Sequence, residues 1–400
     1  MRDPERLAGV YSPNVHSGVI AMKVRAGDIA DLGPAFARRD QAQVDSYPQD
    51  NVADLQTAGV FGAPFGPALG GAGWDTLEST MAVEELAAWS PSTALLAAMP
   101  LGLAGAFASD DGVVPGDYRG RWLDEQQWLA GQYVAHHIFA ACNSEKGAGG
   151  SLDATKAVAR RDDDGRFRVS GEKILASFGE HADYFFSTAK VDPAEVPGCG
   201  VVEFFFVRTD AEGVDILGDW DGFGMRATES HTVVYRDAVA ERMAGYPDFI
   251  ATMQPLTYWF CLFAAIPLGC ARSLLRAVGE PEPVSPALRL RVSEAVMRYE
   301  ALRAYLRETA REWRPGAGAE YAARVLRTKT YVTQEATKLC AELFALSGGR
   351  HYRRTSPVAR TFADSFAGTA LRPPLPLGLE QLTEQFSLGA AGTAQEPAAI

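Results

Sequence analysis

Segments with strand character are confined to the middle of this chain, and helical patterns lie on both sides of them. Between about residues 133 and 242, several runs are rich in Phe, Tyr and Val and are bounded by Gly, Pro and Asp clusters. The runs are 166–169, 184–191, 201–208 and 231–236. Their spacing predicts a small antiparallel barrel or sandwich, so helices must build the rest of the fold.

Helical signals precede the β region. Asp75 or Thr76 is placed to cap a helix that runs to Trp89. The apolar stretch 93–108 follows, and we expect it to kink or split at Pro100, because proline removes a helical hydrogen bond. These segments predict a helical N-terminal domain.

Helical periodicity returns after residue 247, in long segments at about 288–313 and 320–346. With a helix in 248–278 and a shorter one near Arg360, they predict a four-helix bundle. The fold class is therefore α+β. The predicted parts are an N-terminal helical domain at 1–132, a central β domain at 133–245, a C-terminal bundle at 246–388 and a disordered tail at 389–400.

Composition excludes several classes of function. The 400 residues carry 50 acidic and 38 basic side chains, a net charge of −12, which argues against nucleic acid or an anionic membrane as partner. The longest apolar run, 259–268, is about half of the roughly 20 residues that a membrane span needs. Five cysteines without a CxxC pair indicate reduced thiols in a cytoplasmic protein, and no metal site is predicted.

The stretch 141–191 places two polar loops, at 143–151 and 177–183, on the β framework. Such loops present backbone N–H and hydroxyl donors at little steric cost. The isoalloxazine ring of a flavin needs donors at N1, O2 and N5. We therefore take a flavin as the ligand of these loops, with the alternative that Ser144 and Ser177 only cap turns.

Several motifs in register resemble the acyl-CoA dehydrogenase superfamily of flavoproteins, over about residues 50–385. Ser-Glu-Lys-Gly-Ala-Gly-Gly-Ser at 144–151 is similar to that family's Thr-Glu-Pro-x-Ala-Gly-Ser-Asp loop, and 222–230 to its Leu-Gly-Met-Arg-x-Thr-x-Ser segment. The other matching segments are 55–59, 70–74, 84–86, 171–173, 182–183 and 346–349.

The resemblance implies FAD between the β domain and the bundle. Asn143 and Ser144 would lie by the pyrimidine side, and Leu175 and Ser177 beside the ring, with Ser177 directed towards N5. Gly149 in the first loop and the turn at Gly348 and Gly349 complete the implied cofactor site. Because segments 276–281 and 344–346 depart from the family's diphosphate-binding pattern, FMN or diffusible reduced flavin stays an alternative.

The catalytic glutamate of the family is missing from both of its usual positions. One alignment places Arg372 there and another Ala367, while the second position holds Trp259. None of these can abstract a proton. The remaining candidates for chemistry are Arg372, Glu380, Asp364 and His137, and the candidates for a substrate pocket are Tyr258, Trp259 and Arg226.

Three functions are compatible with these motifs. The first is a flavin-dependent oxidoreductase that dehydrogenates an acyl thioester or a related small molecule at the α and β carbons. The second is a flavin monooxygenase that uses reduced flavin and O2, and the third is a non-catalytic partner subunit of a heteromeric dehydrogenase. The resemblance also implies a homodimer or homotetramer.

Overall fold

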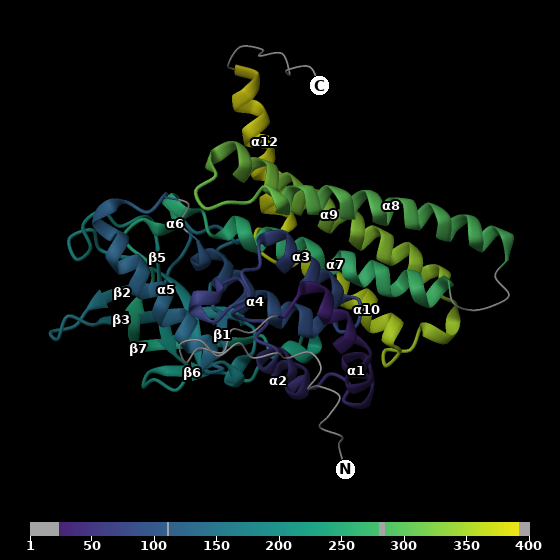
Figure 1. Ribbon diagram of the computed structural model, residues 1–400, viewed down its shortest axis with the longest axis horizontal. Coiled ribbons are helices and arrows are strands. Elements are labelled where there is room, and N and C mark those ends of the chain that lie inside the picture. The colour runs from purple at the N-terminus through teal and green to yellow at the C-terminus, as the bar shows by residue number, and fades with distance from the viewer. Residues whose placement is uncertain (1–23, 110–111, 280–284, 392–400) are drawn as a thin grey trace.

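The computed structural model describes residues 24–109, 112–279 and 285–391, and all its strands lie between Phe139 and Met243. Figure 1 shows the β region on one side and the long C-terminal helices on the other, with helices of the N-terminal part between them. The N-terminal helices are α1 Ile29–Ala42, α2 Gln49–Thr57, α3 Thr76–Ala87, α4 Pro91–Ala108 and α5 Arg119–Val134.

Helix α3 begins where its capping residues predict. The side chain of Asp75 accepts a hydrogen bond from the N–H of Glu78 at 2.7 Å, and the side chain of Glu78 accepts one from the N–H of Asp75 at 3.1 Å. Helix α4 is not split at Pro100, one of the two predicted outcomes, because it is one helix with Pro100 inside it. Every residue from Pro91 to Phe107 is buried, so packing on all sides outweighs the hydrogen bond lost at the proline.

The strands form a sheet that closes on itself. The order of hydrogen-bonded strands around the sheet is β4, β2, β3, β7, β5 and back to β4. Strand β1 also pairs with β4, and β6 pairs with β7. Closure leaves no free edge in that ring. The strands are β1 Phe139–Ala141, β2 Val158–Arg161, β3 Phe167–Ala176, β4 Tyr184–Val191, β5 Glu203–Arg208, β6 Val214–Ile216 and β7 His231–Met243.

Most strand pairs are antiparallel, as predicted, but β1 and β2 both pair with β4 in parallel. These two strands and β6 have three or four residues each, too few for alternation to identify them in the sequence.

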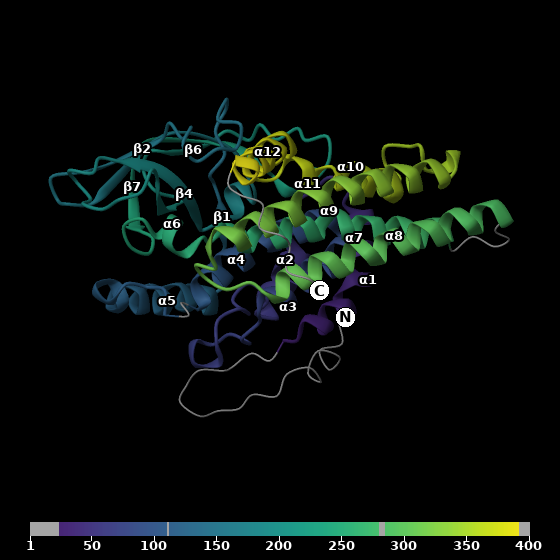
Figure 2. The same ribbon diagram turned by 90° about the horizontal axis from the view of Figure 1, so that it is seen from above.

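Three long helices, α7, α8 and α9, lie side by side and form the body of the C-terminal part (Figure 2). Helix α12 projects from this group (Figure 1). It runs to Ala391 and so passes residue 388, the predicted end of the bundle. Residues 392–400 of the predicted tail lie outside the described residues. The helices are α6 Phe249–Met253, α7 Leu256–Gly279, α8 Pro286–Arg311, α9 Gly318–Leu346, α10 Pro357–Ser365, α11 Ala367–Ala370 and α12 Leu375–Ala391.

Helices α4 and α7 are long and apolar enough to cross a membrane by length and composition alone. Of their most apolar 18-residue windows, 94% and 72% respectively are buried inside the structure. Their apolar surfaces are therefore covered by other parts of the fold.

The contact between α4 and α7 depends on two glycines. A methyl group on Gly102 would lie 2.0 Å from Nε1 of Trp259, and one on Gly105 would lie 2.0 Å from the ring of Tyr258. The absent side chains let two large aromatic residues of α7 pack directly on the backbone of α4.

Gly102→Ala is expected to lower the free energy of unfolding by about 1–3 kcal/mol, because Trp259 must move out of a packed position. This loss outweighs the gain in helix propensity of about 1 kcal/mol. Gly131→Ala is the control: Gly131 is an exposed residue of α5 with nothing within 4 Å of the added methyl group, so the substitution should be stabilising. Urea unfolding of both variants measures the difference, and equal stability would contradict the packing argument.

Candidate functional site

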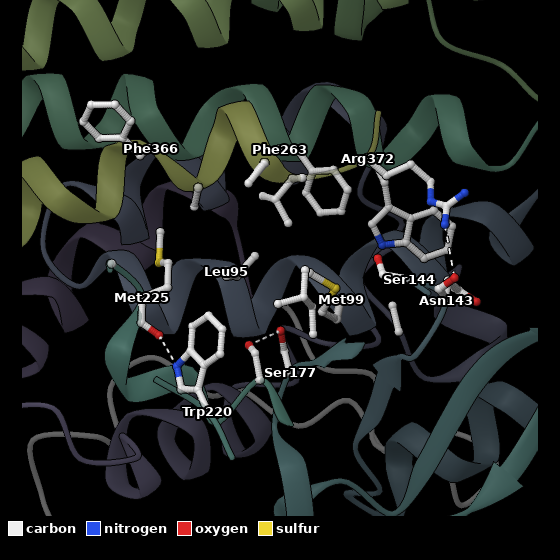
Figure 3. A pocket seen from close by; sticks show the side chains of 18 of the residues that line it. Leu95, Met99, Asn143, Ser144, Ser177, Trp220, Met225, Phe263, Phe366 and Arg372 are labelled. Carbon is white, nitrogen blue, oxygen red and sulfur yellow. Dashed lines mark hydrogen bonds between the residues drawn. The ribbon is translucent and has the colours of Figure 1, made fainter. Parts of the chain in front are cut away.

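A cavity of about 270 Å³ lies where the loops of the β region meet α4, α7 and the segment from α10 to the start of α12. Most of its wall is aromatic or aliphatic (Figure 3). The lining residues include Leu95, Met99, Asn143, Ser144, Leu175, Ser177, Trp220, Met225, Trp259, Phe263, Phe366 and Arg372.

A β-bulge directs Leu175 and Ser177 to this cavity. The pairing of β3 with β7 shifts register between Lys173 and Ala176, and Leu175 has a left-handed backbone with φ 60°. Its side chain is 47% exposed, although leucine usually packs in a core. The hydroxyl of Ser177, at the end of the bulge, lies 3.0 Å from that of Ser230. A strained residue at a cavity wall is typical of a ligand site.

The first polar loop is anchored by a buried ion pair. Nζ of Lys173 lies 2.6 Å from Oε1 of Glu145 and donates to the carbonyl of Thr188 at 2.6 Å. The other carboxylate oxygen of Glu145 accepts the N–H of Lys156 at 2.6 Å. Burial alone would raise the pKa of Glu145, but Lys173 and these N–H groups hold it below its usual value. The charged side chain of Glu145 therefore anchors the first polar loop to Lys173 and to the backbone of Lys156.

Asn143 is oriented by strand β4, which carries Thr188. Its Oδ1 accepts the N–H of Thr188 at 2.9 Å, which leaves Nδ2 without a protein partner in the described part of the chain. The side chains of Asn143 and Ser144 lie together at the polar end of the cavity, near Arg372 (Figure 3).

Arg372 reaches this end from the connection between α11 and α12. Its guanidinium donates to the carbonyls of Gly150 at 2.6 Å and Asn143 at 3.1 Å. Burial lowers the pKa of Arg372 to about 10, so it remains charged at neutral pH. The side chain thus joins the C-terminal segment to the first polar loop.

Lys329, on α9, supports that connection from inside the bundle. It is 1% exposed, and its Nζ donates to the carbonyls of Leu371 at 2.8 Å and Pro373 at 2.5 Å. Both carbonyls flank Arg372, so Lys329 fixes the backbone on either side of the arginine. Burial lowers the pKa of Lys329 to about 7.

This lowered pKa predicts a pH dependence of stability. Between about pH 7 and the ordinary lysine value of about 10.4, the unfolded chain binds the proton of Lys329 more fully than the folded chain, so stability rises with pH. From pH 7 to 8.5, the wild type should gain about 1–2 kcal/mol relative to Lys329→Met. Urea unfolding at both pH values measures this. Lys338→Met, which removes an exposed lysine paired with Glu335, should parallel the wild type.

Met225 lies at the opposite end, on the segment before β7. Its N–H donates to Oδ1 of Asp364 at 2.5 Å, and its carbonyl accepts Nε1 of Trp220 at 3.1 Å (Figure 3). Burial raises the pKa of Asp364 to about 7. This carboxyl lines a second cavity of about 620 Å³ beyond Met225, and it holds the wall of the first cavity without lining it.

Six of the residues predicted from the sequence lie in the wall of the first cavity. They are Asn143, Ser144, Leu175, Ser177, Trp259 and Arg372. Gly149 belongs to the same loop but is not in the wall; its φ of 60° lets the loop turn. Gly348 and Gly349 end α9 and line neither cavity.

Four other candidates lie elsewhere. Tyr258 donates its hydroxyl to Ser79 at 2.8 Å inside the core, and Arg226 pairs with Asp45 at 2.9 Å in the second cavity. His137 is hydrogen-bonded to Gln132 at 2.6 Å, and Glu380 is exposed on α12. None of the four lines the first cavity.

Residues that the sequence did not indicate complete the site. Leu95 and Met99 come from α4, and Phe263 and Phe366 from α7 and the end of α10. Leu95 and Met99 are one helical turn apart, but α4 is apolar all round, so spacing alone cannot identify its cavity side.

The lining is suited to a flavin. Hydroxyl groups of Ser144 and Ser177 and the amide of Asn143 supply donors along one side, next to flat apolar walls. Nε1 of Trp259 is buried and has no hydrogen-bond partner among the described residues. A methyl group on Gly102 would lie 2.0 Å from this nitrogen, so Nε1 packs against the backbone of α4 and is not counted among the donors to the flavin.

Three family models match this chain. Residues 20–111 match the N-terminal domain of acyl-CoA dehydrogenases, residues 140–238 the middle domain and residues 261–371 the C-terminal domain. The chain belongs to the acyl-CoA dehydrogenase superfamily. The family and the fold class predicted from the sequence are thereby confirmed, and this superfamily consists of flavin-dependent oxidoreductases.

Relatives within the acyl-CoA dehydrogenase superfamily carry different activities in their names. A probable acyl-CoA dehydrogenase of Bacillus subtilis, YngJ, is 23% identical, covering 84% of this chain and 91% of its own. The structure of butyryl-CoA dehydrogenase from Megasphaera elsdenii has a TM-score of 0.76 at 20% identity, and the match covers 94% of this chain and 100% of the dehydrogenase. TdsC from Paenibacillus sp. A11-2, a dibenzothiophene monooxygenase solved with FMN and indole, also has a TM-score of 0.76 at 20% identity, covering 91% and 97%.

Proposed function

We propose that this protein is a flavin-dependent monooxygenase that oxidises a small, largely apolar compound with reduced flavin and O2. The observation that carries the proposal is the composition of the cavity wall. Among the residues that the structure describes, those lining this cavity include no Asp, Glu or His. The wall therefore offers no general base of the usual kinds.

Dehydrogenation of an acyl thioester, the first expectation from the sequence, requires such a base within hydrogen-bond reach of the α proton. Two carboxylates that neighbour lining residues in the sequence already have partners. Glu145 is neutralised by Lys173 behind the first polar loop, and Asp364 accepts the N–H of Met225 on the far side of the wall. Neither one lines the cavity.

Monooxygenation makes different demands on the protein. When bound, a reduced flavin supplies two electrons to O2, so that one oxygen atom enters the product and the other leaves as water. The chain must orient the substrate and exclude solvent. Trp220, Phe263 and Phe366 supply apolar walls for both purposes, and Ser177 places a hydroxyl beside the position proposed for the flavin.

The size and lining of the cavity favour a compact aromatic or aliphatic substrate. A wall of aromatic side chains with a few polar groups at one end is typical of small-molecule sites. FMN and FAD both stay open as cofactor, and the FMN bound in the TdsC structure supports FMN. Assembly into a homodimer or homotetramer stays a prediction.

Flavin chemistry separates the two activities. The protein is reconstituted with FMN or FAD, and butyryl-CoA, hexanoyl-CoA and phenylacetyl-CoA are added without oxygen. We expect no bleaching of the flavin absorbance. After chemical reduction and admission of ¹⁸O2, we expect one labelled oxygen atom in the product of an aromatic test substrate such as indole.

Anaerobic bleaching by a thioester would contradict this proposal and restore the dehydrogenase assignment. Absence of any saturable flavin binding would contradict both enzymatic assignments. As a matched control, Arg226→Gln changes an arginine outside the cavity and should leave the results unaltered.

A further inference from the structure

The polar end of the cavity carries positive charge that no nearby carboxylate neutralises. Arg372, which lies in the wall, carries this charge, and Lys329, which burial leaves only partly protonated at neutral pH, lies directly behind it. In the described part of the chain, neither side chain forms a salt bridge, because their protein partners are all backbone carbonyls. This is unusual in a chain with a net charge of −12.

The charge of Glu145 opposes the lowering of the pKa of Arg372 by burial, but no ion pair joins the two side chains in the described part of the chain. Glu145 is already paired with Lys173 at 2.6 Å and accepts two backbone N–H groups besides. Its negative charge is therefore balanced locally, and the positive charge of Arg372 is left over. Buried or half-buried cations are normally paired, because desolvation of an unpaired charge is costly.

The geometry of Arg372 leaves donors available. Its two terminal nitrogens each donate to one carbonyl, of Gly150 and of Asn143. The guanidinium has five N–H groups, and the remaining ones have no partner among the described residues. A planar group with two oxygens, such as a carboxylate, is the natural complement of this donor fork.

We propose that Arg372 is a receptor for a carboxylate on the substrate, so that the substrate combines an apolar body with one anionic end. The apolar body would face Phe263, Phe366 and Trp220, and the carboxylate would face the free N–H groups of Arg372, while Asn143 and Ser144 remain donors to the flavin (Figure 3). Lys329 is a positioning residue, because it holds the carbonyls of Leu371 and Pro373 on both sides of the arginine.

This assignment deepens the proposed monooxygenase function and rests on the same cavity. A second source of the same chemistry is the bound flavin, whose reduced pyrimidine edge is also a planar anion with oxygen acceptors. Binding measurements and flavin potentials distinguish these two sources.

The test measures binding of benzoate and of its neutral counterpart benzamide to the full-length protein by calorimetry, with oxidised FMN present and without added flavin. The wild type is expected to bind benzoate roughly 10- to 100-fold more tightly than benzamide, the range for hydrogen bonds to charged groups. Arg372→Gln should abolish that preference, and Arg372→Lys should retain part of it, because lysine keeps the charge and loses the fork. Arg226→Gln should keep it fully.

Equal binding of benzoate and benzamide by the wild type would overturn the proposal without any variant. A preference for benzoate that survives in a folded Arg372→Gln protein would also overturn it. If, in addition, the midpoint potential of the bound flavin fell in that variant, Arg372 would serve the cofactor instead. Since these readouts need no turnover, a failed oxygenation test leaves them interpretable, and the two failures can be told apart.

Discussion

Lys173→Met is expected to lower the free energy of unfolding by about 3–5 kcal/mol, the largest effect of any single substitution considered for this protein. Methionine fills a similar volume, but it leaves the carboxylate of Glu145 buried without a counter-charge. Both side chains are almost fully inaccessible, at 0% and 3% exposure, so solvent cannot replace the lost partner. Urea unfolding measures the loss, and flavin binding should weaken with it because Glu145 anchors the first polar loop.

The double variant Lys173→Met with Glu145→Gln is the matched control. Removal of both charges should recover much of the stability lost in Lys173→Met, because no unpaired ion remains. The pH dependence provides a second check. The folded state holds the pKa of Glu145 below its usual value, so the wild type keeps this stabilisation above the ordinary glutamate pKa and loses it as pH falls through the lowered one. Lys173→Met at full wild-type stability would contradict this account.

Glu84→Gln is expected to lower the free energy of unfolding by about 2–3 kcal/mol. Glu84, on α3, is 1% exposed and accepts the hydroxyl of Tyr299 at 2.5 Å. It also lies within 2.9 Å of Arg303 and 3.1 Å of Arg307, so one carboxylate ties the N-terminal part to α8. The expected loss is below the full value for a buried pair because both arginines are partly exposed and can turn to solvent.

Thermal and urea unfolding of Glu84→Gln should show one cooperative loss of stability. Glu294→Gln is the control, since Glu294 forms an exposed pair with Arg291 at 3.0 Å within α8 and should change stability by less than about 0.5 kcal/mol. Equal effects of the two substitutions would mean that burial of Glu84 contributes nothing.

The sequence was sufficient where the signal was local. Patterns within a few residues are enough to predict the capping residue Asp75 and parts of strands β4, β5 and β7. The same holds for the two loop hydroxyls, of Ser144 and Ser177. Loop serines with a glycine two or three residues further on can be recognised as turn residues or donors without knowing the rest of the fold. These features therefore needed no tertiary information.

The sequence was insufficient where neighbouring residues face different surroundings. Tyr258 and Trp259 are adjacent on a helix whose neighbours are almost all apolar, yet only Trp259 of these two reaches the cavity. Lys329 is similar, because its acceptors are carbonyls 42 and 44 residues further along the chain, and a single lysine in a helix is ordinarily exposed. Such long-range partners leave no pattern in the sequence.

Helix α4 has a consequence for how the chain acquires its structure. Because every residue from Pro91 to Phe107 is buried, this helix has no face that water can solvate, and its cover comes from α3, α5, α7, α10 and strand β1. A fragment that ends before β1 would keep α3 and α5 but lose the cover from β1, α7 and α10, so that side of the helix would be exposed and the fragment is expected to aggregate. The N-terminal family segment is therefore not expected to fold by itself, and during synthesis α4 is fully buried only after the C-terminal helices have been made.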